Sequence, residues 1–252
     1  MNNRSVIFWF SGTGNSLYAA KQLAANMGAS LVQITNSVPT EAFGGNSTKI
    51  GFVFPSYYGN LPRVVRAFVE KLEVNPDATI FTVVTMGGVG QGSVGALNKV
   101  LKQKGLRLSY GRGIHMPANY VMMYNPADSS KSAKALAQAD ERLKKIAAEI
   151  NVGVESVRTL PVTANNLYKN IEKLDSAFTV DINCTQCGLC ERTCPVGNIK
   201  IDNGKPAWLN HCEHCVACIS WCPAKAIHYG RKTQNRRRYR NPLIKVDELI
   251  KK

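Results

Sequence analysis

The sequence predicts an α/β protein in which a doubly wound parallel sheet, with strand order 2-1-3-4-5, is followed by a small C-terminal α+β module. Two observations support this prediction. Residues 1–150 alternate short apolar runs with amphipathic stretches, as in a parallel sheet that helices cover on both faces. All eight cysteines then lie between Cys184 and Cys222, which marks a separate module.

The strands and helices of the first part follow from its apolar pattern. Residues 6–10 are a continuous apolar run, typical of a central strand covered on both faces, and Trp9 within it is expected in the core. Further strands are expected at residues 31–34, 50–54, 79–86 and 107–114. Helices are expected at residues 16–27, 62–72, 93–104 and 129–151. Gly28 and Pro62 suit the end of the first helix and the start of the second.

Composition and length divide the chain into four expected segments. A chain of 252 residues can bury one core and add a small module. We expect a sheet domain over residues 1–152, a linker with one short helix over 153–180, the cysteine module over 181–230 and a basic tail over 231–252. The linker contains Pro161, Asn165 and Asn166 and has weak periodicity.

The composition, 44% apolar and 19% charged, is ordinary for a soluble globular protein. No apolar run approaches the roughly 18 residues needed to span a bilayer. The first apolar run passes straight into a Gly-rich turn without a small-residue cleavage site, so it reads as a strand and not as a signal peptide. A cytoplasmic location is therefore expected.

The cysteines form a twofold repeat. In each half, two residues separate each of the first three cysteines from the next. A fourth cysteine follows after three further residues and is itself followed by Pro. Three such thiolates can surround three corners of an iron–sulfur cube, while the fourth reaches the other cube. The spacing assigns one [4Fe–4S] cluster to Cys184, Cys187, Cys190 and Cys222, and the other to Cys212, Cys215, Cys218 and Cys194.

Other uses of these cysteines fit less well. A secreted disulfide protein would place cysteines throughout a small domain. Tetrahedral zinc also takes Cys-x-x-Cys pairs, but it does not require three consecutive two-residue spacings before Cys-Pro, twice. His211 and His214 flank Cys212, and an imidazole ligand would raise a cluster's potential. Because four cysteines per cluster are already present, we expect both histidines to hydrogen-bond near a cluster or to face solvent.

Residues 181–229 resemble the bacterial two-cluster ferredoxins. The stretch CPVGNIKIDNGKPAW is similar to that family's hairpin between the two cysteine motifs. The resemblance implies low-potential, one-electron and oxygen-sensitive chemistry.

Three Gly-containing loops follow strands of the predicted sheet. In the first, SGTGNS, backbone amides and hydroxyls can surround a phosphate at a helix N-terminus. It lacks the Gly-Lys-Ser/Thr ending of a Walker A loop, and Leu17 replaces the third glycine of a dinucleotide fingerprint. A plain turn is the alternative. The other two loops, PSYYGNLP and TMGGVGQG, would meet the first at the switch point of the sheet.

The loop SGTGNS closely resembles the phosphate loop of flavodoxins, and the whole chain resembles flavodoxin–ferredoxin fusion proteins, found mostly in anaerobes. The resemblance implies an FMN cofactor and a flavodoxin-like fold. The implied FMN-binding residues are Ser11, Gly12, Thr13, Gly14, Asn15, Ser16, Pro55, Ser56, Tyr57, Tyr58, Gly59, Asn60, Thr85, Met86, Gly87, Gly88 and Gly90. Either Tyr57 or Tyr58 would stack on the flavin, while the other plugs the edge of the core.

The three loops differ from those of ordinary flavodoxins, which surround FMN with acidic residues, because they contain no Asp or Glu. One carboxylate about 8 Å away would disfavour the reduced anionic flavin by roughly 2 kcal/mol at an effective dielectric near 20. The hypothesis is that this FMN has a less negative potential and accepts electrons from the clusters.

The net charge is +15, and the tail contributes a basic run. With two clusters and FMN phosphate at about −2 each, the loaded protein would remain near +9. Such a charge favours an acidic redox partner, with nucleic acid as the rival. For the tail we considered a disordered solvated segment, docking of a partner or packing on the sheet domain, and nucleic-acid binding. Its basic residues are Arg231, Lys232, Arg236, Arg237, Arg238 and Arg240.

Two functions remain open at the level of sequence. The favoured one is an electron carrier that passes electrons between the clusters, FMN and a partner protein. The alternative is a reductase of a quinone, nitro or unsaturated compound, in which residues 115–120 and the following MMYNP form a wall over the flavin; packing of the sheet edge is that segment's simpler role. His115 and Tyr120 are the plausible proton donors. Because the chain has no dinucleotide-binding domain, we expect a ferredoxin-type donor and not NAD(P)H.

Overall fold

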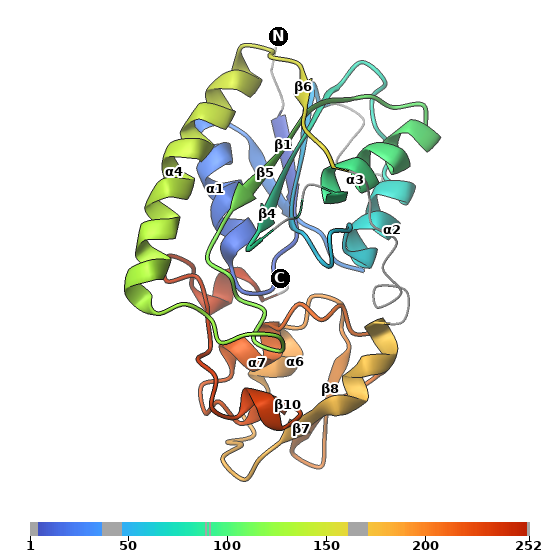
Figure 1. Ribbon diagram of the computed structural model, residues 1–252. Helices are drawn as coiled ribbons and strands as arrows, with labels where there is room; N and C mark the ends of the chain where they lie inside the picture. Colours follow the sequence, from blue (N-terminus) through green and yellow to red (C-terminus); the bar gives the residue numbers. More distant parts are fainter. Residues whose placement is uncertain (1–4, 37–46, 89, 91, 161–170, 251–252) are drawn as a thin grey trace.

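The computed structural model describes residues 5–36, 47–88, 90, 92–160 and 171–250. It has a larger part, a parallel sheet between helices, and a smaller part that contains the cysteines and lies against one end of that sheet (Figure 1). The linker residues Pro161, Asn165 and Asn166 lie outside the described residues, as do Val89 and Gln91 of the third Gly-rich loop.

The sheet of the larger part has the order β2-β1-β3-β4-β5-β6, and every neighbouring pair is parallel. This confirms the predicted order 2-1-3-4-5 and the flavodoxin-like fold. Its strands are β1 (Ser5–Trp9), β2 (Ser30–Gln33), β3 (Lys49–Pro55), β4 (Thr79–Met86), β5 (Leu108–His115) and β6 (Ser156–Val157). The two-residue β6, which lies in the predicted linker, adds a sixth strand at the edge.

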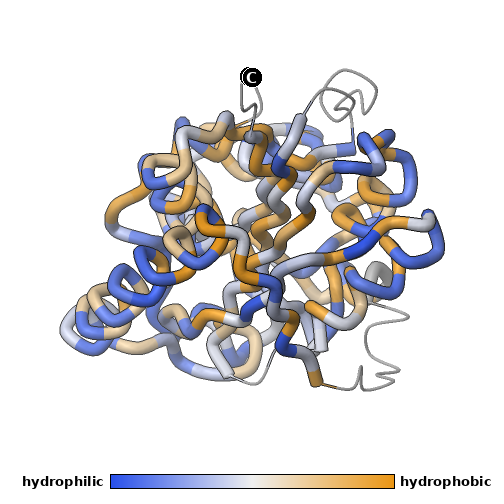
Figure 2. The backbone as a smooth tube through the Cα atoms, turned by 90° about the horizontal axis from the view of Figure 1, so that it is seen from above, coloured by the Kyte–Doolittle hydropathy of each residue, from blue (hydrophilic) through white to orange (hydrophobic). Residues whose placement is uncertain are grey.

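Two helices cover each face of this sheet (Figure 1). They are α1 (Asn15–Met27) and α4 (Ser129–Asn151) on one face, and α2 (Arg63–Lys71) and α3 (Gly92–Gln103) on the other. Alternate residues of β1 serve the two faces: Ile7 and Trp9 pack toward α1 and α4, whereas Phe8 packs in the other core cluster with α2 and α3. Trp9 is thus a core residue, as expected. The apolar centre and polar periphery are visible in Figure 2.

The smaller part is built from two short antiparallel pairs and two short helices. β7 (Phe178–Val180) pairs with β10 (Ile227–Tyr229), and β8 (Ile199–Asp202) pairs with β9 (Lys205–Trp208). The second pair is the predicted hairpin. Asn203 and Gly204 in its turn both have positive φ, the conformation that suits a two-residue hairpin loop.

The short helices of the smaller part each contain one cysteine, near the middle of a motif. They are α6 (Leu189–Arg192) and α7 (Ala217–Trp221). The 3-10 helix η1 (Ile171–Ala177) is the short helix expected in the linker. Because β7 follows it directly, the module's sheet begins three residues before the predicted boundary at Asp181.

The C-terminal segment, residues 231–250, folds back onto the sheet domain. It contains the short 3-10 helices η2 (Arg231–Thr233) and η3 (Val246–Glu248). Tyr239, Ile244 and Leu249 are buried, and Ile244 and Leu249 join the core cluster of α1 and α4. Of the alternatives considered for the tail, the structure shows packing on the sheet domain and not a disordered segment, because apolar residues interspersed with the arginines anchor it.

Among the residues that the structure describes, no helix has the length and apolar character required to cross a membrane.

Candidate functional site

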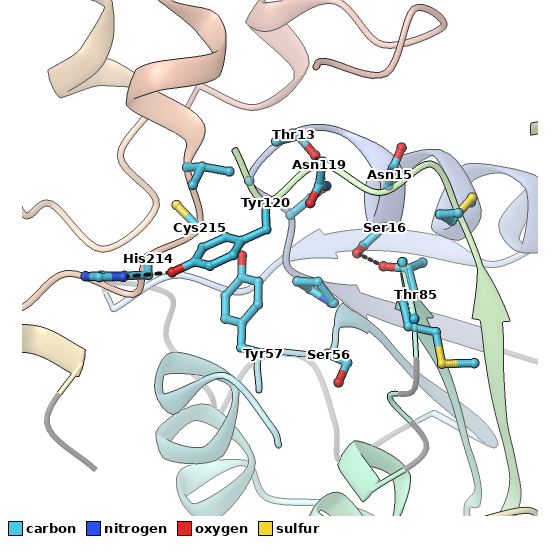
Figure 3. Close-up of a pocket in the computed structure, with 18 of the residues that line it drawn as sticks. Thr13, Asn15, Ser16, Ser56, Tyr57, Thr85, Asn119, Tyr120, His214 and Cys215 are labelled. Carbon is cyan, nitrogen blue, oxygen red and sulfur yellow. Dashed lines mark hydrogen bonds between the residues drawn. The ribbon is translucent and has the colours of Figure 1, made fainter. Parts of the chain in front are cut away.

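A cavity of about 430 Å³ opens at the carboxyl ends of β1, β3 and β4, where the two parts of the molecule meet (Figure 3). Its volume lies in the range of roughly 300–1,000 Å³ that small-molecule sites occupy. Both parts contribute to its wall. The lining residues are Ser11, Gly12, Thr13, Asn15, Ser16, Pro55, Ser56, Tyr57, Tyr58, Gly59, Thr85, Met86, Gly87, Gly88, Met116, Pro117, Asn119, Tyr120, Met123, Tyr124, His214, Cys215 and Val216.

The loop between β1 and α1 forms one end of the cavity. The amide of Gly14 donates to Ser11 Oγ at 3.1 Å, and Gly14 has φ 97°, a left-handed conformation that suits glycine. The hydroxyls of Ser16 and Thr85 are 2.7 Å apart and tie this loop to the end of β4. Because α1 begins directly after Gly14, its unpaired amides and positive dipole end face the loop, as in a phosphate site.

The second loop is a tight turn from Tyr57 to Asn60. The two residues exchange backbone hydrogen bonds of 3.1 and 2.8 Å, and Tyr58 and Gly59 between them have φ of 53° and 73°. Ser93 Oγ donates to Ser56 Oγ and to the carbonyl of Asn60, which holds the turn against α3. Both tyrosines line the cavity.

The tyrosine rings of this turn have different neighbours. Tyr57 packs edge-on against Phe10, with ring centroids 6.2 Å apart, whereas Tyr58 packs edge-on against Tyr120 at 5.8 Å. Tyr57 therefore sits against the core of the sheet, and Tyr58 against the wall formed by the later loop.

The third loop places Thr85, Met86, Gly87 and Gly88 on the cavity wall. Three other predicted residues lie behind the wall: Gly14 beside Asn241, Asn60 in the tyrosine turn, and Gly90, where an added Cβ would lie 2.7 Å from Ser56 Cβ. As the sequence indicated for the loops, no Asp or Glu is present among the described lining residues.

The segment after β5 contributes residues to the cavity wall. Met116, Pro117, Asn119 and Tyr120 line the cavity, whereas His115 is exposed and Ala118 lies against Gly87. Asn119 Nδ2 donates to Thr13 Oγ1 at 2.6 Å. We call residues 116–126 the cover loop. This hydrogen bond joins the cover loop to the loop between β1 and α1.

The cysteine module supplies three lining residues that the sequence analysis missed for this cavity: His214, Cys215 and Val216. Tyr120 bridges the two parts. Its hydroxyl lies 3.2 Å from His214 Nδ1 (Figure 3) and is also hydrogen-bonded to the hydroxyl of Tyr58. Burial lowers the pKa of His214 to about 4, so its imidazole is neutral at pH 7.

The module docks closely on the first loop. A Cβ added to Gly12 would lie 2.1 Å from the carbonyl oxygen of Cys215, so a side chain there cannot be accommodated. Trp221 Nε1 donates to the carbonyl of Gly12 at 3.0 Å. The buried carboxylate of Glu213 accepts from the amides of Arg63 and Val64 at the start of α2. A single apolar cluster extends from the sheet into the module.

The eight cysteines lie in two groups. Cys184, Cys187, Cys190 and Cys222 together line a second, smaller cavity. Cys194, Cys212, Cys215 and Cys218 form a deeper group in which the charges of neighbouring thiolates, after burial itself, raise the pKa values of Cys215 and Cys218. In each group, three cysteines of one motif lie with the fourth cysteine of the other motif.

Backbone amides point at sulfur atoms of the deeper group. The amide of Asn198 donates to Cys194 Sγ at 3.1 Å, and that of His214 donates to Cys212 Sγ at 3.2 Å. Burial raises the pKa of Cys212 to about 12, so without a bound metal this thiol is protonated at pH 7.

The arrangement of the thiols can be compared with single-ion and cluster sites. In the described part of the chain, no three His, Cys, Asp or Glu side chains converge as one metal ion requires. A tetrahedral zinc site needs such convergence, whereas each thiolate of a cubane binds its own iron atom and stands further from the others. The structure joins none of the eight cysteines in a disulfide.

No protein-family model and no curated protein matches the chain. Solved structures with a similar fold include a flavodoxin from Streptococcus pneumoniae TIGR4, 15% identical, with a TM-score of 0.40 over 60% of this chain and 99% of that one. An FMN-dependent NADH-azoreductase from Bacillus anthracis, in complex with FMN, is 8% identical, with a TM-score of 0.41 over 59% and 99%. A flavoprotein from Lactobacillus acidophilus, in complex with FMN, is 12% identical, with a TM-score of 0.36 over 44% and 93%. These values are too low to transfer a function.

Proposed function

We propose that this chain is an electron-transfer protein that binds FMN in the cavity between its two parts and two [4Fe–4S] clusters on its eight cysteines. The observation that carries the proposal is the position of Cys215. It belongs to the deeper cysteine group and also lines the cavity that contains the loop between β1 and α1. A group bound in the cavity would therefore touch a cluster ligand.

The residues around the cavity suit a flavin mononucleotide. The loop of Ser11 to Ser16 offers hydroxyls and helix N-terminal amides to a phosphate, and it contains no side chain that would repel one. Tyr57, Tyr58 and Tyr120 offer aromatic faces and edges to a planar ring.

The two cysteine groups differ in exposure, which separates their roles. Cys187 of the first group is exposed, whereas Cys194, Cys212 and Cys218 of the deeper group are buried. When bound, a cluster carries one electron, whereas a flavin can hold two. The first group thus lies where a partner protein can deliver electrons, and the deeper group lies beside the cavity in which pairs would be collected.

The acid-free cavity supports the proposed direction of transfer. Without a carboxylate on the described wall, the reduced anionic flavin is not penalised by charge repulsion. The FMN should therefore have a less negative potential than it would beside acidic residues. Anaerobic potentiometry tests this: an FMN potential below that of both clusters would reverse the direction.

A specific observation favours the reductase as a second candidate. Met123 at the cavity is 66% exposed and Tyr124 is 39% exposed, so part of the cavity wall is accessible from solvent. A quinone or nitro compound could approach a flavin there. The hydrogen-bonded hydroxyls of Tyr58 and Tyr120 belong to the cavity wall, where they could donate a proton to such a substrate.

The proposal also covers the partner protein and the cellular location. The positive net charge fits an acidic electron-transfer protein as donor or acceptor. Unbridged cysteines and iron–sulfur chemistry fit a reducing compartment, the cytoplasm.

The central experiment is anaerobic purification followed by chemical analysis. We expect about eight iron atoms per chain, as two cubanes require, and one releasable FMN. Absence of either the brown iron–sulfur absorbance or the yellow mononucleotide contradicts the proposal. To separate the two candidates, dithionite-reduced protein is mixed with a panel of quinones and nitro compounds: rapid turnover of one compound favours the reductase, and slow indiscriminate reoxidation favours the carrier.

A further inference from the structure

The side-chain amide of Asn15 connects three separate segments at the start of α1. Asn15 Nδ2 donates to the carbonyl of Pro117 in the cover loop at 3.0 Å. Its Oδ1 accepts from the hydroxyl of Tyr239 at 2.7 Å and from Nδ2 of Asn241 at 3.1 Å. Tyr239 and Asn241 belong to the C-terminal segment, more than 220 residues further along the chain. All three side chains are buried.

Asn241 also holds the backbone of the loop between β1 and α1. The backbone amide of Asn241 donates to the carbonyl of Thr13 at 2.8 Å, and the residue is fully buried. A Cβ added to Gly14 would lie 3.0 Å from Asn241 Cβ and 3.2 Å from Ile244 Cβ. The C-terminal segment therefore packs directly behind the amides that face the cavity.

The same segment makes hydrogen bonds before this contact and an ion pair after it. Before it, Arg236 Nη1 donates to the carbonyl of Val121 at 2.8 Å, and Arg237 Nε donates to that of Pro126 at 2.9 Å, both in the cover loop. After it, Glu248 pairs with Lys21 of α1. The segment thus spans from the cover loop, past the loop between β1 and α1, to the outer side of α1.

From this geometry we infer that Tyr239 and Asn241 are positioning residues of the flavin site, through which the C-terminal segment holds the loop of Ser11 to Ser16 ready for the FMN phosphate. The inference rests on the proposed function of that loop. Glycine-rich loops lose much conformational freedom when they order around a ligand. A loop that is already held pays less of this cost on binding, so its affinity is higher.

The inference predicts an effect specific to phosphate. Tyr239 and Asn241 contact the loop between β1 and α1 from behind and do not line the cavity. Their loss should weaken binding of FMN, which has the phosphate, and leave binding of riboflavin, which lacks it, nearly unchanged. General damage to the fold would weaken both ligands.

The test uses full-length, cluster-loaded protein from which the flavin has been removed. FMN and riboflavin are titrated into the wild type, Tyr239→Phe and Asn241→Ala, with flavin fluorescence quenching as the readout. Each variant removes a hydrogen bond to a buried partner, so FMN affinity should fall by about tenfold and riboflavin affinity by less than about twofold. Leu243→Ala is the matched control, because its side chain lies in the same segment but is exposed.

The outcomes are distinct. Equal weakening of FMN and riboflavin, or unchanged FMN affinity in both variants, would overturn the inference. Iron content and circular dichroism identify a variant that has failed to fold, and Tyr239→Phe, which deletes one oxygen, is then the decisive variant. If the cluster-loaded wild type binds neither flavin, the proposed function itself fails, a result that the variants cannot mimic.

Discussion

At the scale of single residues, Gly12 and Cys215 define how the two parts of the molecule meet. Gly12 is needed because the backbone of Cys215 occupies the space where its side chain would be. The sequence identified Gly12 as part of a phosphate loop and Cys215 as an iron ligand, but nothing in their local patterns places them in contact. That contact depends on how the module docks, which is a tertiary property.

Gly12→Ala should push the module away from the sheet domain. The added methyl group would meet backbone, which cannot rotate aside, so we expect a loss of about 1–3 kcal/mol in unfolding free energy. Electron transfer from clusters to flavin should also slow. Denaturant unfolding and stopped-flow absorbance measure the two effects. Ala25→Leu, at an exposed position of α1, is the control and should change neither; a Gly12→Ala variant that behaves like it would refute the close contact.

Tyr120→Phe tests the hydrogen bonds that cross from the cover loop to the module. The change removes the hydroxyl that Tyr58 and His214 share, leaving partly or fully buried polar atoms without it. We expect the unfolding free energy to fall by about 1–3 kcal/mol. Tyr124→Phe, which loses an exposed hydrogen bond to the amide of Tyr120, should cost less than about 0.5 kcal/mol. Equal losses in the two variants would argue against a structural role for the bridge.

At the scale of elements, most helices and strands follow from the sequence. The apolar run of β1, the continuous strand β4 and the amphipathic helix α4 were predicted to within a residue or two, because each is long enough for its periodicity to be clear. The hairpin of β8 and β9 followed from its resemblance to ferredoxins. The pattern of five strands and four helices also predicted which loops would meet at the switch point of the sheet.

Other elements could not be predicted, for physical reasons. The strand β6 has only two residues, too few for any periodic pattern. In the C-terminal segment the arginines dominate the sequence pattern, so the pattern predicts a basic tail. The buried contacts are made by Tyr239, Ile244 and Leu249, which follow no regular spacing. The participation of His214 in the cavity depends on module docking, and a histidine beside a cysteine motif carries no local signal of it.

The fourth cysteine of each motif lies with the first three of the other motif, and this arrangement predicts different effects for two alanine variants. Cys222→Ala should remove the cluster of the exposed group, and Cys194→Ala that of the deeper group, since each lies with the other motif's cysteines. Each variant should retain about four iron atoms per chain. Only Cys194→Ala should abolish rapid flavin reduction, because the deeper group borders the cavity. Rapid flavin reduction that survives in Cys194→Ala but is lost in Cys222→Ala would contradict this arrangement.

At the scale of the whole molecule, the two parts share one core and one cavity. Apolar residues of the module join the cluster that lies under α2 and α3, and Glu213 bonds the start of α2. Because the two parts share this core, the module is packed against the sheet domain and is not joined to it by the linker alone. Under the proposed function a separate partner protein would deliver the electrons, and the charge of the molecule would then influence the encounter.

The rate of electron delivery should therefore depend on salt. With a net charge of +15 before the cofactors are counted, association with an acidic ferredoxin-type donor should be fast at low ionic strength. Raising salt from 0.05 to 0.5 M should slow it by about tenfold or more. Stopped-flow reduction measures the rate, and photoreduction by neutral deazariboflavin is the control. Equal salt response for the two reductants would exclude steering by charge.

The buried contact between Asn241 and the carbonyl of Thr13 has a consequence for biosynthesis. The loop between β1 and α1 is synthesised more than 220 residues before the residues that brace it, and those residues also follow every cysteine of the module. Until the C-terminal segment has been made, the nascent loop is unbraced. If the brace is needed for tight flavin binding, such binding has to come after all the cysteines have been synthesised.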